Sequence, residues 1–416
     1  MSITLSGTSI KPFDVKEIRK DFPILSREVN GHPLVYLDNA ASSQKPDYVL
    51  ERMDHYYRNI HANVHRGVHQ LSQEATEAFE KSRRTIANFI GAPSDAEVIF
   101  TRGTTESINL VAYTFGLSQL KEGDEIIVSE LEHHSNIVPW QLICGLKGAH
   151  LKIIPVFADG TIDLDWLSKS ITSKTKLVAV AHASNSLGTI NPVKEIIEIA
   201  HAHGVPVLLD GAQAIAHLPI NVAELDVDFY AFSSHKMYGP TGIGILYGKE
   251  SWLNALPPWQ GGGEMIEEVK WSGTTYNKLP FKFEAGTPDI AGAIGLAAAC
   301  DYISSFDRNA MTQHEHNLLQ TCTNAMAELP GMIPVGQASD KVSVYSFNIE
   351  GLHPYDVGTI LDQQGIAVRT GHHCTQPLMD RFGIPGTVRA SFALYNTVEE
   401  IDRLVEATRK AIKILS

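Results

Sequence analysis

The amino-acid sequence predicts an α/β fold with a mostly parallel β-sheet between layers of helices. Short apolar runs rich in Val, Ile and Leu recur between about residues 35 and 250, and amphipathic helical stretches separate several of them. Strands that are buried on both faces of a parallel sheet show this near-continuous apolar pattern. The chain has 416 residues, which is enough for two or three domains with a sizeable core.

The predicted elements follow one another along the first half of the chain. Residues 13–28 carry apolar residues at helical spacing, which predicts a short packed arm. Six apolar runs are then predicted to be strands: 97–101, 124–130, 151–156, 176–184, 205–211 and 228–236. Helices are predicted between several of them, at 105–119, 136–147 and 192–203.

The second half begins with a segment of unusual composition. Residues 257–288 are rich in Gly, Pro and Trp and predict a long irregular excursion, a kind of loop that is usually functional. A helix-rich stretch follows, and beyond it a smaller α/β unit is predicted, with strands at 342–349 and 387–394 and a helix near 354–364. We therefore expect an N-terminal arm that packs with the small domain, a large domain and a small C-terminal domain, at residues 1–28, 29–300 and 301–416.

The composition limits the partners that we expect. The formal net charge is −13 at pH 7, and nucleic-acid binding needs clustered Lys and Arg, so no nucleic acid is expected. No apolar run reaches about 18 residues, and the first residues lack the apolar region of a signal peptide, so no membrane span is expected either. Four widely separated cysteines fit a reducing compartment. We expect a cytoplasmic protein.

Polar residues follow two of the predicted strands, where each strand ends. Asp210 ends one run and Gln213 lies one turn further on, while Ser233, His235 and Lys236 end the next run. Ligands of open α/β sheets bind beyond the carboxyl ends of the strands. The Asp and the Lys should therefore face one crevice.

Pyridoxal phosphate needs such a set of residues. A lysine amine binds its aldehyde, and a carboxylate pairs with the pyridinium nitrogen. Thr104 and Thr105 begin a predicted helix, whose N-terminus suits a phosphate, and His133 follows a strand and can stack on the ring. Each fragment also has an ordinary explanation, because an Asp often ends a strand as a turn former and TTE can be a capping arrangement. The order of the fragments and their places at strand ends favour the cofactor.

Cys374 differs from the other cysteines in its surroundings. It lies in GIAVRTGHHCTQP, after a short strand and in a Gly-containing turn, with Arg369, His372 and His373 nearby. A reactive thiol needs such a partly exposed, electropositive setting. Cys144, Cys300 and Cys322 lie in helical or apolar contexts, which predict buried structural residues. Adjacent histidines point in different directions, and no second ligand pair has suitable spacing, so no zinc site and no other metal is expected.

Five motifs occur in a fixed order along the chain: SELEHHSNIVPW, DGAQA, SSHKMYGPTGIG, FEAGTPD and RTGHHC. Together they resemble the SufS-type, or group II, cysteine desulfurases in the class V aminotransferase branch of fold-type I pyridoxal-phosphate enzymes. The resemblance extends from LDNAASSQKP at 37–46 to the C-terminal helix. It implies a large domain with a mostly parallel seven-stranded sheet between helices, and a smaller C-terminal α/β domain.

The resemblance also implies roles for individual residues. Lys236 binds the cofactor covalently, Asp210 meets the pyridine nitrogen and Gln213 bonds the ring hydroxyl. His133 stacks on the ring and moves protons. The remaining roles concern the phosphate, which is held by Thr104, Thr105, Ser233 and His235 and, from the other subunit of a dimer, by Gly286 and Thr287. The substrate is bound by Arg389, which anchors its carboxylate, and by Arg369, Asn185, His65 and Arg66.

The implied reaction converts L-cysteine to L-alanine, with the sulfur held as a persulfide on Cys374. The sulfur then passes to an acceptor protein for iron–sulfur cluster assembly, and members of the family also cleave selenocysteine. The short stretch around Cys374 requires a dedicated acceptor. Tyr355 stands in HPYD where enzymes that use the zinc-dependent SufU type offer a His, which favours a SufE-type acceptor.

Three other functions are alternatives to cysteine desulfuration, and one sequence feature speaks against each. A class V aminotransferase would use the same Lys and Asp but needs no exposed Cys, so RTGHHC speaks against it. A nucleotide-dependent oxidoreductase would need a G-x-G-x-x-G between an early strand and a helix, which the sequence lacks. A non-catalytic scaffold would have lost part of the Lys, Asp and Cys set, and all three are present.

Overall fold

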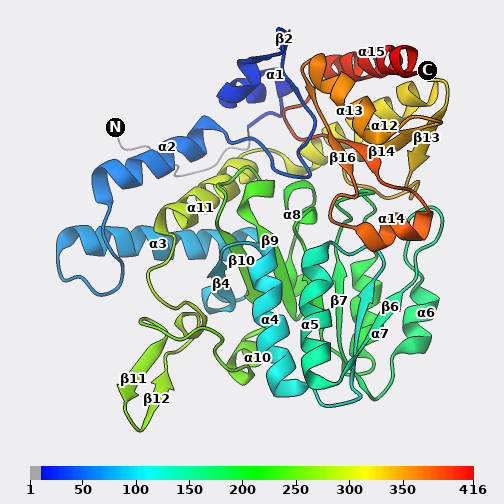
Figure 1. The fold of residues 1–416 in the computed structure, drawn as a ribbon. Coiled ribbons are helices and arrows are strands. Elements are labelled where there is room, and N and C mark those ends of the chain that lie inside the picture. The colour runs from blue at the N-terminus through cyan, green and yellow to red at the C-terminus, as the bar shows by residue number, and fades with distance from the viewer. Residues whose placement is uncertain (1–10) are drawn as a thin grey trace.

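The computed structural model describes residues 11–416, and its centre is a seven-stranded sheet (Figure 1). The strand order is β4-β10-β9-β8-β7-β5-β6. Strand β10 alone runs opposite to the others, because it pairs antiparallel with both β9 and β4. The bounds are β4 Val98–Thr101, β5 Glu125–Ser129, β6 His150–Ile154, β7 Thr175–Ala181, β8 Val207–Asp210, β9 Phe229–Ser233 and β10 Gly244–Gly248. The predicted fold class is confirmed.

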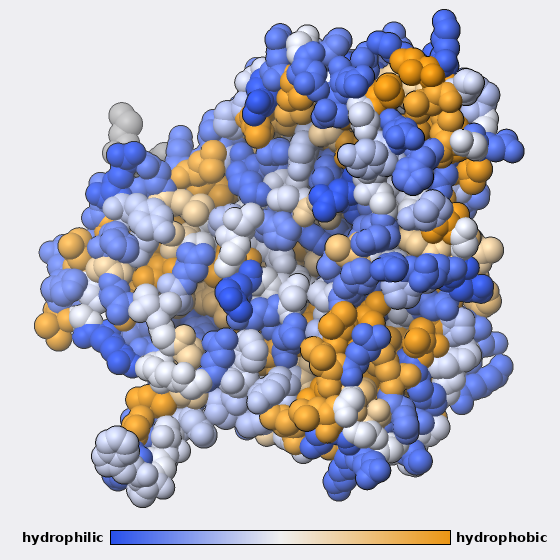
Figure 2. Space-filling model, viewed as in Figure 1, coloured by the Kyte–Doolittle hydropathy of each residue, from blue (hydrophilic) through white to orange (hydrophobic). Residues whose placement is uncertain are grey.

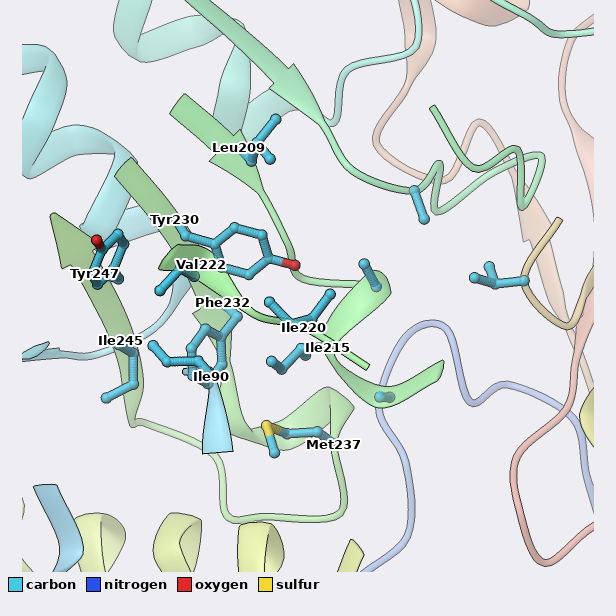
Figure 3. Close-up of a cluster of buried hydrophobic side chains, with 14 of the residues drawn as sticks. Ile90, Leu209, Ile215, Ile220, Val222, Tyr230, Phe232, Met237, Ile245 and Tyr247 are labelled. Carbon is cyan, nitrogen blue, oxygen red and sulfur yellow. The ribbon is translucent and has the colours of Figure 1, made fainter. Parts of the chain in front are cut away.

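Side chains alternate between the two faces of the sheet, as the pleat of a strand requires. On one face, Leu208 and Ala231 pack against helices α4 and α5. On the other, Leu209, Tyr230 and Phe232 pack against Ile215 and its neighbours, which Figure 3 shows. The helices of the large domain are α2 Asp47–His55, α3 Gln70–Phe89, α4 Thr104–Gln119, α5 Val138–Lys147, α6 Leu164–Ser170, α7 Val193–His201, α8 Ala214–His217, α9 Val222–Leu225, α10 Glu250–Ala255 and α11 Ile290–Ser304.

The C-terminal part contains its own four-stranded antiparallel sheet, in the order β13-β14-β17-β16. Its core is separate from the two faces of the large sheet and includes Val35 and Leu37 from the N-terminal region. Along the chain the change of core falls within α12, because Met311 still belongs to the core of the large domain and Leu318 to the C-terminal core. The three domain limits stay predictions. The elements are α12 Arg308–Ala327, β13 Met332–Val335, β14 Val344–Ile349, α13 Pro354–Gln363, β16 Arg369–Gly371, α14 Gln376–Phe382, β17 Thr387–Ser391 and α15 Val398–Leu415.

The part of the N-terminal arm that the structure describes contacts one helix of the large domain, α11, and one helix of the C-terminal part, α15. Helix α1, Val15–Ile18, is followed by Arg19, whose guanidinium pairs with Glu400 of α15 at 2.8 Å. The Tyr302 hydroxyl of α11 donates to Asp21 at 2.7 Å. The arm therefore ties α11 to α15. Three pairs of short strands complete the chain: β1 Glu28–Val29 with β2 His32–Pro33, β3 Val35–Tyr36 with β15 Ile366–Ala367, and β11 Ile266–Lys270 with β12 Gly273–Tyr276.

The hairpin β11–β12 corrects part of the sequence prediction, which has only irregular structure at 257–288. The hairpin projects away from the body of the protein (Figure 1), and nearly all its residues, including Trp271 at its turn, are exposed. A strand without a buried face has no need to alternate apolar and polar residues, so its sequence lacks the usual signal. Within residues 11–416, no helix is both long and apolar enough for a membrane crossing.

Candidate active site

The carboxyl ends of β7, β8 and β9 meet beside a cavity of about 190 Å³. Asp210 is the last residue of β8, and Lys236 lies in the short turn Ser234–Lys236 that follows β9. The cavity also receives residues from the N-terminal segment and from the C-terminal sheet. Its lining is Ala40, Ala41, Thr104, Thr105, His133, Ser135, Asn185, Asp210, Ala212, Ser233, His235, Lys236, Arg369, His373, Cys374 and Arg389.

Lys236 and Asp210 provide opposite charges without touching. Among the described residues, the Lys236 amine forms no hydrogen bond, and burial lowers its pKa to about 8, against the opposing effect of Asp210. Burial raises the pKa of Asp210, while the charge of Lys236 and the Ala212 N–H at 2.9 Å lower it. A lysine with such a pKa has a sizeable neutral fraction near physiological pH, which makes it a nucleophile.

His133 follows β5 and contributes a neutral ring. The backbone N–H of Ser135 donates to Nδ1 at 3.1 Å, so the ring hydrogen of the neutral form lies on Nε2. Burial, helped by the charge of Lys236, lowers the pKa of His133 to about 3. The ring is therefore an uncharged flat surface at ordinary pH.

Glu132, which the sequence analysis missed, fixes the loop that carries His133. Its carboxylate accepts hydrogen bonds from the Ala181 N–H at 3.0 Å, from the Asn136 amide at 2.6 Å and from the Ser129 hydroxyl. It is fully buried, and burial raises its pKa to about 7. The only signal in the sequence is an acidic residue three positions after the end of a buried strand. Its contacts join the end of β5 to the end of β7.

The N-terminus of α4 faces the same cavity. The Ser233 hydroxyl accepts the Thr104 N–H at 2.8 Å and lies 2.8 Å from the Thr104 hydroxyl. Gly103, just before the helix, has φ 149°, and a Cβ there would lie 3.1 Å from the Ser233 hydroxyl oxygen. The first N–H groups of a helix have no partner within the helix and carry partial positive charge. This end of the cavity can therefore hold an anion.

Arg389 of β17 forms the opposite wall. It is 2% exposed and donates to the Asn185 carbonyl at 2.7 Å and to Asp38 at 3.1 Å, while its Nε has no partner among the described residues. Arg369 is half exposed and lies 3.4 Å from the second oxygen of Asp38. Asp38 was also missed, although it lies in the LDNAASSQKP motif. It aligns two guanidinium groups at the cavity, which suits a carboxylate ligand.

Cys374 lies in a strained turn at the mouth of the cavity. His373 and Cys374 have φ of 51° and 59°, a left-handed conformation that is uncommon for residues other than glycine. The turn is held from two sides, because the His134 N–H donates to the Cys374 carbonyl at 2.8 Å and the Asn185 amide donates to the His373 carbonyl at 2.7 Å. Strain that neighbours maintain is a recurrent property of functional sites.

The four cysteines differ in exposure. Cys374 is partly exposed, and the other three are buried. Burial raises the pKa of Cys144 to about 11 and raises the pKa of Cys300 and Cys322 further. Only Cys374 is therefore accessible as a nucleophile among them. Within residues 11–416 no group of three or more His, Cys, Asp or Glu side chains is arranged to hold a metal ion.

The remaining predicted site residues lie outside this cavity. The Gln213 amide donates to the Ala40 carbonyl at 2.7 Å, behind the lining. Gly286, Thr287 and His65 line a second cavity of about 350 Å³, and Arg66 pairs with Glu264 of that cavity at 2.9 Å. Within one chain the structure does not bring these four residues to Lys236. Their roles, like those of the residues around Lys236, stay predictions.

Comparisons with known proteins give a consistent result. The aminotransferase class-V family profile matches residues 35–404. A protein of Escherichia coli O127:H6 named cysteine desulfurase is 52% identical over 404 residues, covering 97% of this chain and 99% of that protein. The crystal structure of the cysteine desulfurase CsdA from Escherichia coli has a TM-score of 0.91 at 41% identity and covers 97% of this chain and 100% of that one. A cysteine desulfurase from Thermococcus onnurineus, solved in its apo form, has a TM-score of 0.91 at 43% identity, with coverages of 96% and 98%.

The lowered pKa of Lys236 predicts a pH-dependent stability of the cofactor-free protein. Between pH 8 and 10.5 the unfolded chain holds a proton on this amine that the folded chain has lost, so stability should rise with pH. At about 1.4 kcal/mol per pKa unit, the gain attributable to Lys236 is about 3 kcal/mol at most. Urea unfolding of the wild type and of Lys236→Met at several pH values measures it. Parallel stability curves for the two proteins would show that the amine is not buried as described.

Proposed function

The chain belongs to the class V aminotransferase family and is a pyridoxal-phosphate-dependent cysteine desulfurase, and we propose that Lys236 and Cys374 carry its reaction. One observation supports this assignment most. An accessible thiol, a lysine amine without a hydrogen bond among the described residues, and a buried carboxylate line the same cavity. An aminotransferase needs the lysine and the carboxylate only.

The residues of the cavity fit the cofactor. The Lys236 amine would bind its aldehyde, and the Asp210 oxygen that does not accept the Ala212 N–H would meet the ring nitrogen. His133 would cover the ring. Gln213 would bond the ring hydroxyl in place of the Ala40 carbonyl, to which its amide donates in the single chain. The phosphate would lie at the N-terminus of α4, against Thr104, Thr105, Ser233 and His235. When bound, the cofactor supplies an electron sink that stabilises negative charge on the substrate's carbon skeleton.

The two arginines would orient L-cysteine. The unpartnered Nε of Arg389 and the exposed face of Arg369 would bind its carboxylate, with Asp38 holding both guanidinium groups in place. Asn185 contributes from β7 and also fixes the turn of Cys374 through its amide. A carboxylate held at Arg389 leaves the substrate's side chain free to reach that turn.

Lys236 would then transfer the proton, and Cys374 would transfer the sulfur. The neutral Lys236 amine would take the Cα proton, and the His133 Nε2–H would donate a hydrogen bond within the cavity. The Cys374 thiolate would attack the substrate sulfur. A sulfur–sulfur bond forms on Cys374, the substrate's carbon–sulfur bond breaks, and its electron pair stays with the carbon skeleton, which leaves as L-alanine after protonation. The same steps apply to selenocysteine, whose softer selenium we propose as an alternative atom for the Cys374 thiolate to attack.

A homodimer would complete the site. Gly286, Thr287, His65 and Arg66 lie together at the second cavity, where the phosphate and substrate of a partner's site could be reached. Apolar side chains are also exposed on α4 and α5, and Figure 2 shows them as an orange area over these helices. The aliphatic ones are Leu117, Val138, Leu142 and Leu146, and Tyr113 of α4 is exposed as well. Patches of this kind mark protein–protein contacts.

The short turn of Cys374 implies a partner for the persulfide. The turn occupies only the residues between β16, which ends at Gly371, and α14, which begins at Gln376. The sulfur cannot travel far, so an acceptor protein would collect it at the cavity mouth and pass it to iron–sulfur cluster assembly. We place the reaction in the cytoplasm, because an accessible free thiol persists in a reducing compartment.

The acceptor type is testable with purified proteins. Tyr355 is 66% exposed on α13 and offers no imidazole to a zinc-dependent acceptor. We therefore expect a SufE-type acceptor to increase alanine production from cysteine several-fold and a SufU-type acceptor to leave it unchanged. Stimulation by the SufU type alone would contradict the assignment.

The role of Cys374 is tested by Cys374→Ala with Lys236→Ala as its counterpart. Cys374→Ala should bind the cofactor and show its visible absorbance, because the lysine is intact, yet lose sulfur transfer by at least a hundred-fold. Lys236→Ala should lose both. Alanine release from cysteine and the absorbance spectrum are the measurements. Wild-type desulfuration by Cys374→Ala would refute the proposed role.

The shared site is tested with mixed dimers. Thr287 is exposed in a single chain, so Thr287→Glu should fold normally while repelling the phosphate of the partner's site. A dimer of Thr287→Glu with Lys236→Ala contains one site with an intact lysine and an intact Thr287 from the other chain. It should recover about half of the wild-type activity, although each variant alone is inactive. No recovery would place Thr287 at the site of its own chain.

A further inference from the structure

The carbonyl oxygen of His235 accepts four hydrogen bonds from one N-terminal segment. The Ser43 N–H donates at 3.0 Å, and the Ser43 and Ser42 hydroxyls each donate at 3.2 Å. The Lys45 ammonium donates at 3.2 Å. A carbonyl oxygen has two lone pairs, so two donors would satisfy it. Four donors are more than a buried acceptor requires. The bonded peptide is the one that joins His235 to Lys236.

Lys45 is an unusual residue to find in this place. Its amine is largely buried, which lowers its pKa to about 8, and among the described residues it forms no ion pair. Its bonding partners are the carbonyls of Ser43 and His235 and the Ser42 hydroxyl at 3.4 Å. Burial of an ammonium group without a carboxylate costs several kcal/mol in general. If this position contributed only to the stability of the fold, an apolar side chain would be more favourable here.

The same segment holds the far end of the lysine turn. The Ser43 hydroxyl accepts the Tyr238 N–H at 2.7 Å, and Tyr238 has φ 67°, a left-handed conformation. The turn from His235 to Tyr238 is therefore bonded at both ends to residues 42–45. Lys236 lies between the two bonded positions, and its side chain makes no hydrogen bond to any residue that the structure describes.

We propose that Lys45 is a positioning residue for Lys236, which clamps the 235–236 peptide so that the Lys236 amine meets the aldehyde of the cofactor. The inference rests on the proposed function. A lysine side chain has four rotatable carbon–carbon bonds, and within residues 11–416 no hydrogen bond or ion pair restricts the Lys236 amine. Hydrogen bonds therefore fix Lys236 through its backbone, and the clamp on its peptide supplies them. A misplacement of about 1 Å can cost about a hundred-fold in rate.

The experiment compares three variants of the cofactor-free protein. Lys45→Met removes the ammonium and keeps the length of the side chain, and Ser43→Ala removes a second donor to the same carbonyl. Lys341→Met is the matched control, because Lys341 is also largely buried with a pKa lowered to about 8, and donates to the Gly336 carbonyl at 2.7 Å outside the cavity. Pyridoxal phosphate is added to each, and the growth of the absorbance of the lysine-bound cofactor gives the rate of attachment. Urea unfolding of each cofactor-free variant gives its stability.

The proposal predicts a rate of attachment at least ten-fold lower in Lys45→Met, a smaller decrease in Ser43→Ala, and a rate within two-fold of the wild type in Lys341→Met. The KM for cysteine should change little, since Arg389 is untouched. Attachment at the wild-type rate in Lys45→Met would overturn the proposal, as would an equal decrease in Lys341→Met at equal loss of stability. If Lys45→Met fails to fold, the rate in Ser43→Ala decides. A wild-type protein that never acquires the absorbance would instead contradict the proposed function.

Discussion

The attraction between Lys236 and Asp210 across a buried gap is the interaction on which the site depends. Neither group bonds the other, yet each changes the ionisation of the other, because the interior screens charge weakly. Burial favours the neutral amine, and the charge of Asp210 limits that effect. The pKa of Lys236 therefore falls only to about 8. The geometry follows from the parallel sheet, since β8 and β9 end at the same edge and deliver the two residues there.

The cavity gathers positive charge in a protein that is negative as a whole. The chain has a formal net charge of −13, while Lys236, Arg369 and Arg389 line one cavity with the N-terminus of α4. Asp38 offsets part of this charge and aligns both arginines. Anionic ligands are therefore attracted into the site from a surface that repels them. A phosphorylated cofactor and an amino acid with its carboxylate are both anionic ligands of this kind.

The sequence predicted those parts of the site that depend on local order. Lys236, Asp210 and His133 follow buried strands, and the topology of a parallel sheet brings such positions together. Asp38 was missed because its partner Arg389 is distant along the chain, and Glu132 because its bond to the Ala181 N–H joins two strand ends that no spacing relates. Strand β10 was missed because GIGILYG is short, flanked by glycines and antiparallel, outside the alternation of strand and helix that predicted the others. Within one chain, Gly286 and Thr287 line a separate cavity.

The central claim is that sulfur from cysteine comes to rest on Cys374. Mass spectrometry of a tryptic digest, after a brief exposure of the holoenzyme to cysteine and alkylation, tests it most directly. The account predicts one additional sulfur atom on the peptide 370–381, which contains Cys374, and none on the peptides that contain the three buried cysteines. Additional sulfur on another cysteine, or on none while alanine is released, would contradict it.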